Sequence, residues 1–166
     1  MQHRIKVGLS EKSIDNAISE LQAYKKNLPV WADEICKRLA FMGATKVSLG
    51  FSRAIYSGDK DVEVSVEPIQ NGYSIKANGE SVLFIEFGAG ATYGYGHPEA
   101  KEYGMGPGTY PGKGHWDDPS GWWIPQEKGG GHTYGNPPAA VMFHTANELR
   151  DSIYEVAREV INSGRH

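Results

Sequence analysis

Apolar side chains recur at helical spacing through the first quarter of the chain. Ser10 or Ser13 can cap the start of such a helix, and Gly43 is a natural stop. Pro29 lies inside the pattern, where it removes a backbone donor. We therefore expect a long helix over about residues 13–41, either kinked near Pro29 or divided there into two nearly collinear helices. Its apolar face, with steps of three, four or seven residues, carries Ile14, Ile18, Leu21, Leu28, Ala32, Ile35, Leu39 and Met42.

A two-residue alternation follows in the middle of the chain. Residues 61–67 alternate between valine and polar side chains, which is typical of a half-buried strand, and Pro68 is expected to end it. Asn71-Gly72 favours a tight hairpin with residues 73–77 as the return strand. Residues 81–87 are almost continuously apolar, so we expect a third, central strand that completes an antiparallel meander.

Two further segments alternate more weakly. Ile5, Val7 and Leu9 indicate an edge strand before the first helix. Residues 46–51 indicate another strand after that helix, with Val47, Leu49 and Phe51 on one face. Either strand would extend the small antiparallel sheet.

The C-terminal part of the chain predicts a second long helix. Asn136 can cap it, Pro137 or Pro138 fits its first turn, and Gly164 lies just past its end. We expect this helix to pack on the sheet through one apolar face, which carries Met142, Ala146, Leu149, Ile153, Val156 and Val160.

These patterns predict an α+β fold in a single domain over residues 1–166, a length that suits one domain. We expect residues 88–136, which are rich in glycine, proline and aromatic residues, to form a long inserted loop. Loops of this length are usually functional or disordered, but disordered segments are poor in aromatics. We therefore expect the loop to become ordered by packing its rings against another surface.

Charge and composition exclude several functions. The formal net charge of -3 gives no basic excess to neutralise phosphates, so we expect no sequence-specific nucleic-acid binding. No apolar run is long enough for a membrane span, and the first residues do not resemble a signal peptide. Cys36 is the only cysteine, so neither an intrachain disulfide nor a cysteine zinc site is expected. We expect a cytoplasmic origin as the default.

Residues with catalytic or metal-binding chemistry form no coherent set. Gly88-Ala89-Gly90 opens no helix, so a plain turn is favoured over a phosphate-binding loop. His97, His115 and Asp117 are zinc-ligand types, but their spacing matches no known motif. Glu86 lies inside an apolar run, where a structural salt bridge or backbone hydrogen bond is favoured over catalysis. We expect no enzymatic activity, no cofactor and no metal.

The aromatic residues of the loop are the strongest functional signal. Their rings can form a small core that folds back on the sheet, or an interface, since Trp and Tyr are enriched in interface hot spots. A carbohydrate platform is a variant of the interface, usually built on an all-β scaffold. The residues expected to make partner contacts are Phe87, Tyr110, Trp116, Trp122 and Trp123.

The order of short motifs in the chain resembles that of a known family. A predicted helix and meander precede residues 82–90, and Gly/Pro/aromatic motifs follow at residues 106–112, 115–116 and 121–123. Asn136-Pro137-Pro138-Ala139 then leads into the last helix. This arrangement resembles the neck proteins of long-tailed bacteriophages of the HK-ninety-seven type, the head-tail joining or tail-completion family. The similarity covers nearly the whole chain from Ser13 onward.

The resemblance implies a structural virion protein that is not an enzyme. Such proteins act as copies in a ring at the junction between head and tail, so the expected partners are further copies of this chain and other neck, portal-side or tail proteins. The expected location is the virion of a phage or prophage. Ring closure needs one surface of each subunit to meet a different surface of the next.

Two alternatives remain from the residues alone. One is a small metal-dependent hydrolase with His97, His115 and Asp117 as ligands. The other is a carbohydrate- or peptide-binding module that uses the loop of residues 88–136. Both place the function in the same inserted segment as the neck assignment does.

Overall fold

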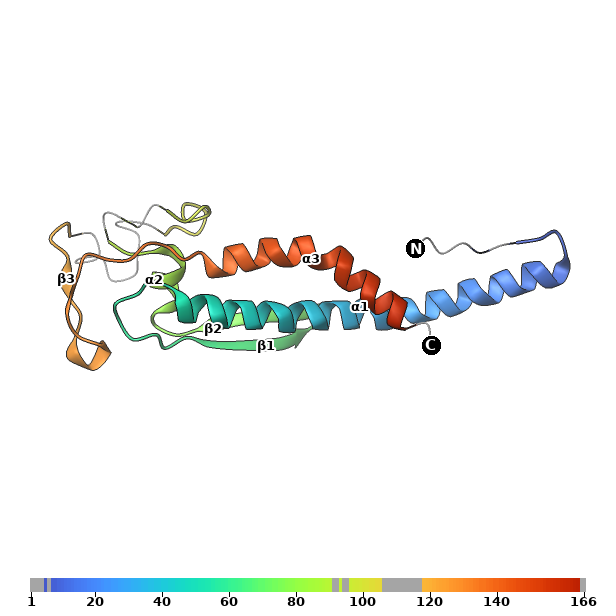
Figure 1. Cartoon of the computed structure of the whole chain (residues 1–166), viewed down its shortest axis with the longest axis horizontal. Coiled ribbons are helices and arrows are strands. Elements are labelled where there is room, and N and C mark those ends of the chain that lie inside the picture. The colour runs from blue at the N-terminus through green and yellow to red at the C-terminus, as the bar shows by residue number, and fades with distance from the viewer. Residues whose placement is uncertain (1–4, 6, 91–92, 94–95, 106–117, 165–166) are drawn as a thin grey trace.

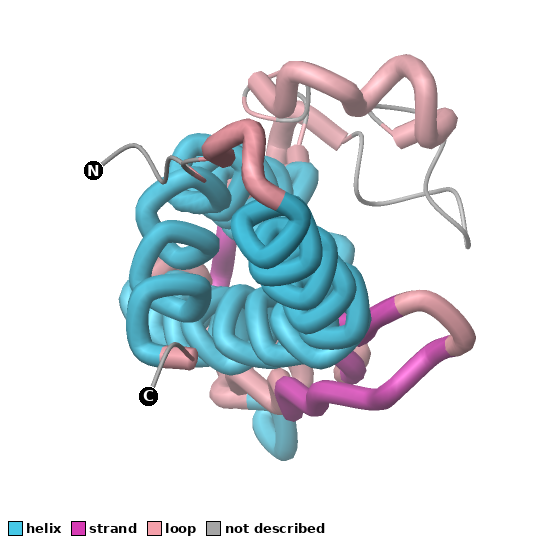
Figure 2. The backbone as a smooth tube through the Cα atoms, turned by 90° about the vertical axis from the view of Figure 1, so that its right-hand side faces the viewer, coloured by secondary structure: helices cyan, strands magenta, loops and turns pink. Residues whose placement is uncertain are grey.

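The computed structural model describes residues 5, 7–90, 93, 96–105 and 118–164. The fold is α+β and elongated, with two long helices side by side and a small sheet against one of them (Figure 1). Seen from one end, the helices lie together and the strands lie to one side (Figure 2). The long helices are α1 (Glu11–Arg53) and α3 (Val141–Ser163), and the shorter elements are β1 (Glu63–Ile69), β2 (Gly72–Asn78), α2 (Val82–Phe87), β3 (Trp122–Trp123), the 3-10 helix η2 (Gln126–Lys128) and β4 (His132–Thr133).

The first helix is longer than its sequence pattern indicates. The Ser10 side chain caps α1 by accepting a hydrogen bond from the Ser13 amide at 3.3 Å, as expected. The helix then continues through Pro29 as one element of 43 residues, about 65 Å at about 1.5 Å per residue. A change of axis at Pro29 stays a prediction. The edge strand expected before α1 was wrong for the described residues 5 and 7–10, which form no strand.

Gly43 does not end α1, and residues 46–51 are its last turns rather than a strand. The buried positions Gly43, Val47 and Phe51 are four residues apart, whereas Leu49 is 45% exposed. A Cβ at Gly43 would lie 2.5 Å from the Ile75 Cδ1 atom and 2.7 Å from a Leu149 methyl carbon. The glycine therefore lets the sheet and α3 approach α1 closely, so it is a packing position and not a stop.

The hairpin predicted at Asn71-Gly72 is confirmed. β1 and β2 pair antiparallel from Glu63 opposite Asn78 to Ile69 opposite Gly72. Pro68 does not end β1 but pairs with Tyr73, which is tolerated because both strands of a two-stranded sheet are edges. The sheet packs on α1.

The predicted third strand at residues 81–87 was wrong, because this run forms the helix α2. The Asp61 carboxylate accepts hydrogen bonds from the Glu80 amide (2.6 Å), the Ser81 amide (2.9 Å) and the Ser81 hydroxyl (2.5 Å), and so holds the start of the helix. Ile85 and Phe87 are buried. A short apolar run can be a buried helix as well as a buried strand, and periodicity does not separate the two.

The main core lies where both long helices, α2 and the sheet meet. Val47, Phe51, Ile85 and Val141 form its buried centre. α3 runs antiparallel to α1, packs along it and reaches the sheet at Gly43, as predicted for the C-terminal helix (Figure 1). Its C-cap is Gly164, as expected, but it begins only at Val141, so the expected placement of Pro137 or Pro138 in its first turn was wrong.

The helical assignment of residues 46–51 can be checked by two substitutions. Phe51→Ala should lower the free energy of unfolding by about 3–5 kcal/mol, because it opens a cavity in the core. Leu49→Ala should change it by about 0.5 kcal/mol or less, because this side chain lies on the outer face of α1. Urea unfolding followed by circular dichroism measures both. Equal losses would favour a strand, in which the two residues share a face.

Candidate interaction site

A buried carboxylate fixes the position of α2 against α3. The N-cap residue of α3 is Ala140, which has the left-handed φ of 46° and no side chain that can accept a hydrogen bond. The Glu86 carboxylate, 5% exposed, takes this role by accepting from the amides of Met142 (2.9 Å) and Phe143 (3.1 Å). The structural role expected for Glu86 is therefore confirmed.

His97 completes the environment of this carboxylate. Its Nε2 atom lies 3.3 Å from a Glu86 oxygen, and its ring is buried. The centre of the His97 ring lies 4.5 Å from that of Phe87, and the centre of the Phe87 ring lies 5.7 Å from that of Tyr103. Phe87 is only 7% exposed and holds residues 96–105 against α2. Its expected part in partner contacts stays a prediction.

Two antiparallel stretches of backbone meet where the inserted segment begins and ends. The amides and carbonyls of Ala89 and Asn136 exchange hydrogen bonds at 3.0 and 3.1 Å. A Cβ at Gly90 would lie 2.3 Å from the Tyr134 carbonyl oxygen, and one at Gly135 would lie 2.0 Å from that of Ala89. These glycines therefore permit the two backbones to approach closely, because a side chain at either position would clash. Asn136 is not the cap of α3, and its side-chain amide donates to the Phe84 carbonyl instead.

A short hairpin presents aromatic rings on the surface of the inserted segment. Trp122 pairs with Thr133, and Trp123 pairs with His132. The His132 ring lies edge-on to the rings of Trp123 and Tyr134, with distances of 5.2 Å and 4.9 Å between ring centres. Trp123 is 75% exposed. An exposed tryptophan on a hairpin held by ring contacts is the kind of residue that anchors interfaces.

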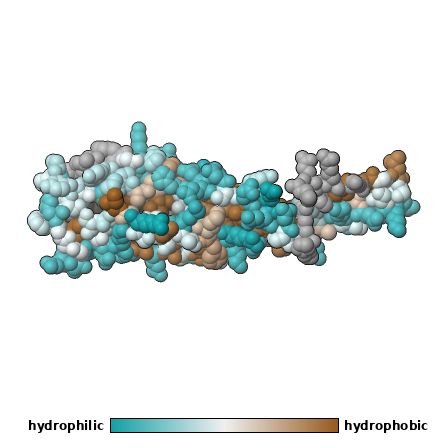
Figure 3. Space-filling view, in the orientation of Figure 1, coloured by the Kyte–Doolittle hydropathy of each residue, from teal (hydrophilic) through white to brown (hydrophobic). Residues whose placement is uncertain are grey.

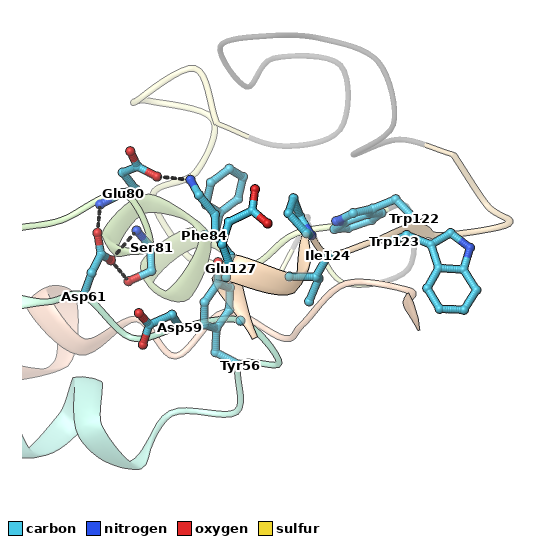
Figure 4. A pocket seen from close by; sticks show the side chains of 13 residues that line it. Tyr56, Asp59, Asp61, Glu80, Ser81, Phe84, Trp122, Trp123, Ile124 and Glu127 are labelled. Carbon is cyan, nitrogen blue, oxygen red and sulfur yellow. Dashed lines mark hydrogen bonds and ion pairs between the residues drawn. The ribbon is translucent and has the colours of Figure 1, made fainter. Parts of the chain in front are cut away.

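The same hairpin forms one wall of a cavity of about 590 Å³ (Figure 4). We call it the acidic aromatic pocket. The walls are apolar and come from Tyr56 after α1, Phe84 on α2 and residues 122–125. Four carboxylates, those of Asp59, Asp61, Glu80 and Glu127, and one cation, that of Lys128, also line it. Its volume is in the range of ligand-binding clefts.

Negative side chains outnumber positive ones around this pocket. Lys128 forms an ion pair with Glu80, and the hydrogen bond that the lysine ammonium donates to that carboxylate raises the pKa of the lysine. Burial raises the pKa of Tyr56, and the negative charge of Asp61 raises it further. Among the described residues, the carboxylates of Asp59 and Glu127 have no hydrogen-bond or ion-pair partner. The pocket therefore has a net negative charge and an apolar interior.

The structure brings together only some of the residues expected to make contacts. Trp122 and Trp123 both line the pocket. Tyr110 and Trp116 lie outside the described residues, as do His115 and Asp117 of the hydrolase alternative. His97 is engaged by Glu86, and the described part of the chain contains no group of three or more metal-ligand side chains.

Sequence reasoning missed Tyr56, Asp59, Phe84 and Glu127 as members of one site. The only local signal near them is Ser57-Gly58-Asp59, a sequence typical of a turn. Because the residues come from three distant parts of the chain, only the fold places them around one cavity.

Comparisons of the chain with protein-family models, curated proteins and solved structures found no match. Among the described residues, no helix combines the length and apolarity that crossing a membrane requires.

The capping role of Glu86 predicts a large effect of its removal. Glu86→Ala should lower the free energy of unfolding by at least about 2 kcal/mol, because it leaves two helix amides without an acceptor. Glu86→Gln, which keeps one carbonyl oxygen, should cost less. The exposed Glu63→Gln serves as a control with about 0.5 kcal/mol or less. Urea unfolding would contradict the capping role if Glu86→Ala matched this control.

Asp61 predicts a pH-dependent contribution to stability. Its partial burial acts to raise its pKa, but the hydrogen bonds from Ser81 and Glu80 outweigh this and lower the pKa below the ordinary value. A lowered pKa contributes stability above the unfolded value of about 3.9, and this contribution is lost as the pH falls through the folded value. Asp61→Ala should therefore destabilise the protein by about 1 kcal/mol or more at pH 7.

The difference between wild type and Asp61→Ala should shrink as the pH falls below about 4. Thermal unfolding of both proteins between neutral and acidic pH measures this difference. A gap that stays constant over the whole range would show that the charge of Asp61 has no part in holding α2.

Proposed function

We propose that this chain is a structural virion protein of a long-tailed phage or prophage, acting in head-tail joining or tail completion as part of an oligomeric ring. The observation that carries the proposal is a projecting helical arm, defined as residues 11–30 of α1. The motif order of the sequence supports the specific assignment to the phage neck. A net charge of -3 suits a protein that lets DNA pass without binding it tightly.

The arm extends beyond the rest of the molecule. α3 ends beside Trp31, where a Cβ at Gly164 would lie 2.5 Å from the indole nitrogen. The 20 residues of α1 before this point project about 30 Å past the helix pair (Figure 1). In the space-filling view the arm is a narrow projection with apolar side chains on its surface (Figure 3).

One face of the arm carries an apolar stripe that is half exposed. The spacing of four, three and seven residues places its members together on the helix surface. An isolated helix of this length is marginal in water, because most helical stability in proteins comes from packing. A second polypeptide that covers the stripe would therefore stabilise the arm. The stripe comprises Ile14 (44% exposed), Ile18 (47%), Leu21 (56%) and Leu28 (48%).

A ring of identical copies supplies such a cover. Each copy carries an arm at one end and the body of the molecule at the other, so the arm of one copy can pack on the body of the next. Contacts between two different surfaces close into a ring when the rotation per subunit permits it. This interface accounts for the exposed stripe without any catalytic role for the chain.

The arm predicts a selective effect on assembly. Leu21→Ser should raise the dissociation constant of the oligomer at least about tenfold, because it removes apolar surface buried between copies. Val30→Ser is a matched control, since Val30 is 66% exposed on the opposite face of the same helix. Light scattering over a wide concentration range measures both variants. Equal effects of the two would contradict a role of the stripe.

The neck assignment itself is tested in the virus. Deleting the gene from the phage or prophage that encodes the chain should give heads and tails that do not join, or tails with an incomplete end, by electron microscopy. Complementation with wild type should restore virions, whereas Leu21→Ser should restore fewer. Normal virions after deletion would rule out the proposed function.

A further inference from the structure

We infer that the acidic aromatic pocket of one copy binds the basic N-terminal segment, residues 1–9, of a second copy. The inference rests on the proposed ring, since it names the contact that each copy would make with the next. It is carried by the charge of the pocket, the charge of the segment, and the distance between the two within one chain.

The pocket contributes negative charge to the contact. Asp59 and Glu127 line it with carboxylates that have no hydrogen-bond or ion-pair partner among the described residues. Tyr56, Phe84 and Trp122 supply ring surface beside them (Figure 4). Carboxylates next to aromatic faces are the surroundings that arginine favours, because its guanidinium pairs with carboxylates and stacks on rings.

The segment side of the contact has the complementary chemistry. Residues 1–9 contain Arg4 and Lys6 and no acidic residue. Apolar residues alternate with the two cations at Ile5, Val7 and Leu9. Val7 is 59% exposed and Leu9 is fully exposed in the single chain. A segment with alternating cationic and apolar side chains matches a pocket whose rim is acidic and whose walls are apolar.

Distance excludes the pocket of the same copy. The segment precedes Glu11 at one end of α1, whereas Tyr56 follows Arg53 at the other end (Figure 1). The 43 residues between span about 65 Å as a helix. The ten residues before Glu11 reach about 35 Å at most when they are fully extended. The segment therefore reaches a pocket only in a neighbouring copy, so the contact joins two different surfaces of two copies, as ring closure requires.

A peptide-binding measurement tests the contact directly. The probe is a synthetic peptide with the sequence of residues 1–9 and a C-terminal fluorophore, titrated with the full chain at concentrations where it is monomeric. Fluorescence anisotropy should show saturable binding that weakens as salt is raised. A peptide with Arg4→Ala and Lys6→Ala should bind at least tenfold more weakly.

The matching change in the protein is Asp59→Asn with Glu127→Gln. Both side chains are exposed and make no hydrogen bond among the described residues, so the variant should fold normally. It should bind the wild-type peptide at least tenfold more weakly. Glu63→Gln with Asp151→Asn removes the same charge from exposed sites outside the pocket and should bind as wild type does. Absence of saturable binding at millimolar peptide, or equal binding by the pocket variant, would overturn the inference.

Light scattering of the same variants separates this inference from the proposed function. If the segment occupies the pocket in the ring, Asp59→Asn with Glu127→Gln should weaken the oligomer at least tenfold, and the charge-matched control should not. A pocket variant that forms the ring as wild type does would overturn the pocket assignment while the ring itself stands. Loss of the ring by Leu21→Ser alone would then locate the interface on the arm.

Discussion

The contact between the Glu86 carboxylate and the start of α3 organises the body of the molecule. α3 begins at Ala140, which offers no side-chain acceptor, so the amides of its first turn depend on a group from elsewhere. Glu86 provides it from α2 and also meets the buried His97. A charge in this position is stable only because each oxygen accepts a hydrogen bond in an otherwise apolar setting. The contact fixes α2, and α2 in turn places Phe84 in the acidic aromatic pocket and Phe87 under residues 96–105.

Local signals were sufficient for part of the fold. The hairpin follows from Asn71-Gly72 and the long helices follow from their apolar period, because turn geometry and amphipathic spacing act over a few residues. Residues 46–51 and 81–87 could not be assigned in this way. Their structure depends on contacts far along the chain, with Ile75 and Leu149 packing at Gly43 and Asp61 holding the start of α2. In both segments a short apolar pattern fitted two structures, and tertiary packing selected the helix.

The site was predictable to a smaller extent than the fold. Trp122 and Trp123 were recognisable because tryptophan in a glycine-rich loop is unusual. Asp59 and Glu127 carry no local signal, since acidic residues on a surface are ordinary. They gain significance only because the loop after α1 lies beside the β3–β4 hairpin, where the Asp59 amide donates to the Lys128 carbonyl at 3.1 Å. A pocket assembled from distant segments becomes visible only once their packing is known.

The two ends of the molecule carry different surfaces, an apolar stripe on the arm and an acidic pocket in the body, and the proposed ring would cover both. The arm exposes apolar side chains at one end, and the pocket at the other end holds the carboxylates of Asp59 and Glu127, which have no partner among the described residues. The two cannot meet within one chain, because about 40–60 Å of α1 separates the stripe residues from Arg53 at the pocket end of the helix. A dimer that paired arm with arm would cover the stripes but leave the carboxylates without cations. In the proposed ring, head-to-tail association would cover the stripe and neutralise the pocket in the same step, because every copy contributes one of each. Such a contact closes into a ring or continues as a filament according to the rotation between neighbours. A docking partner such as a portal or tail component would favour the ring by imposing its own symmetry on the copies.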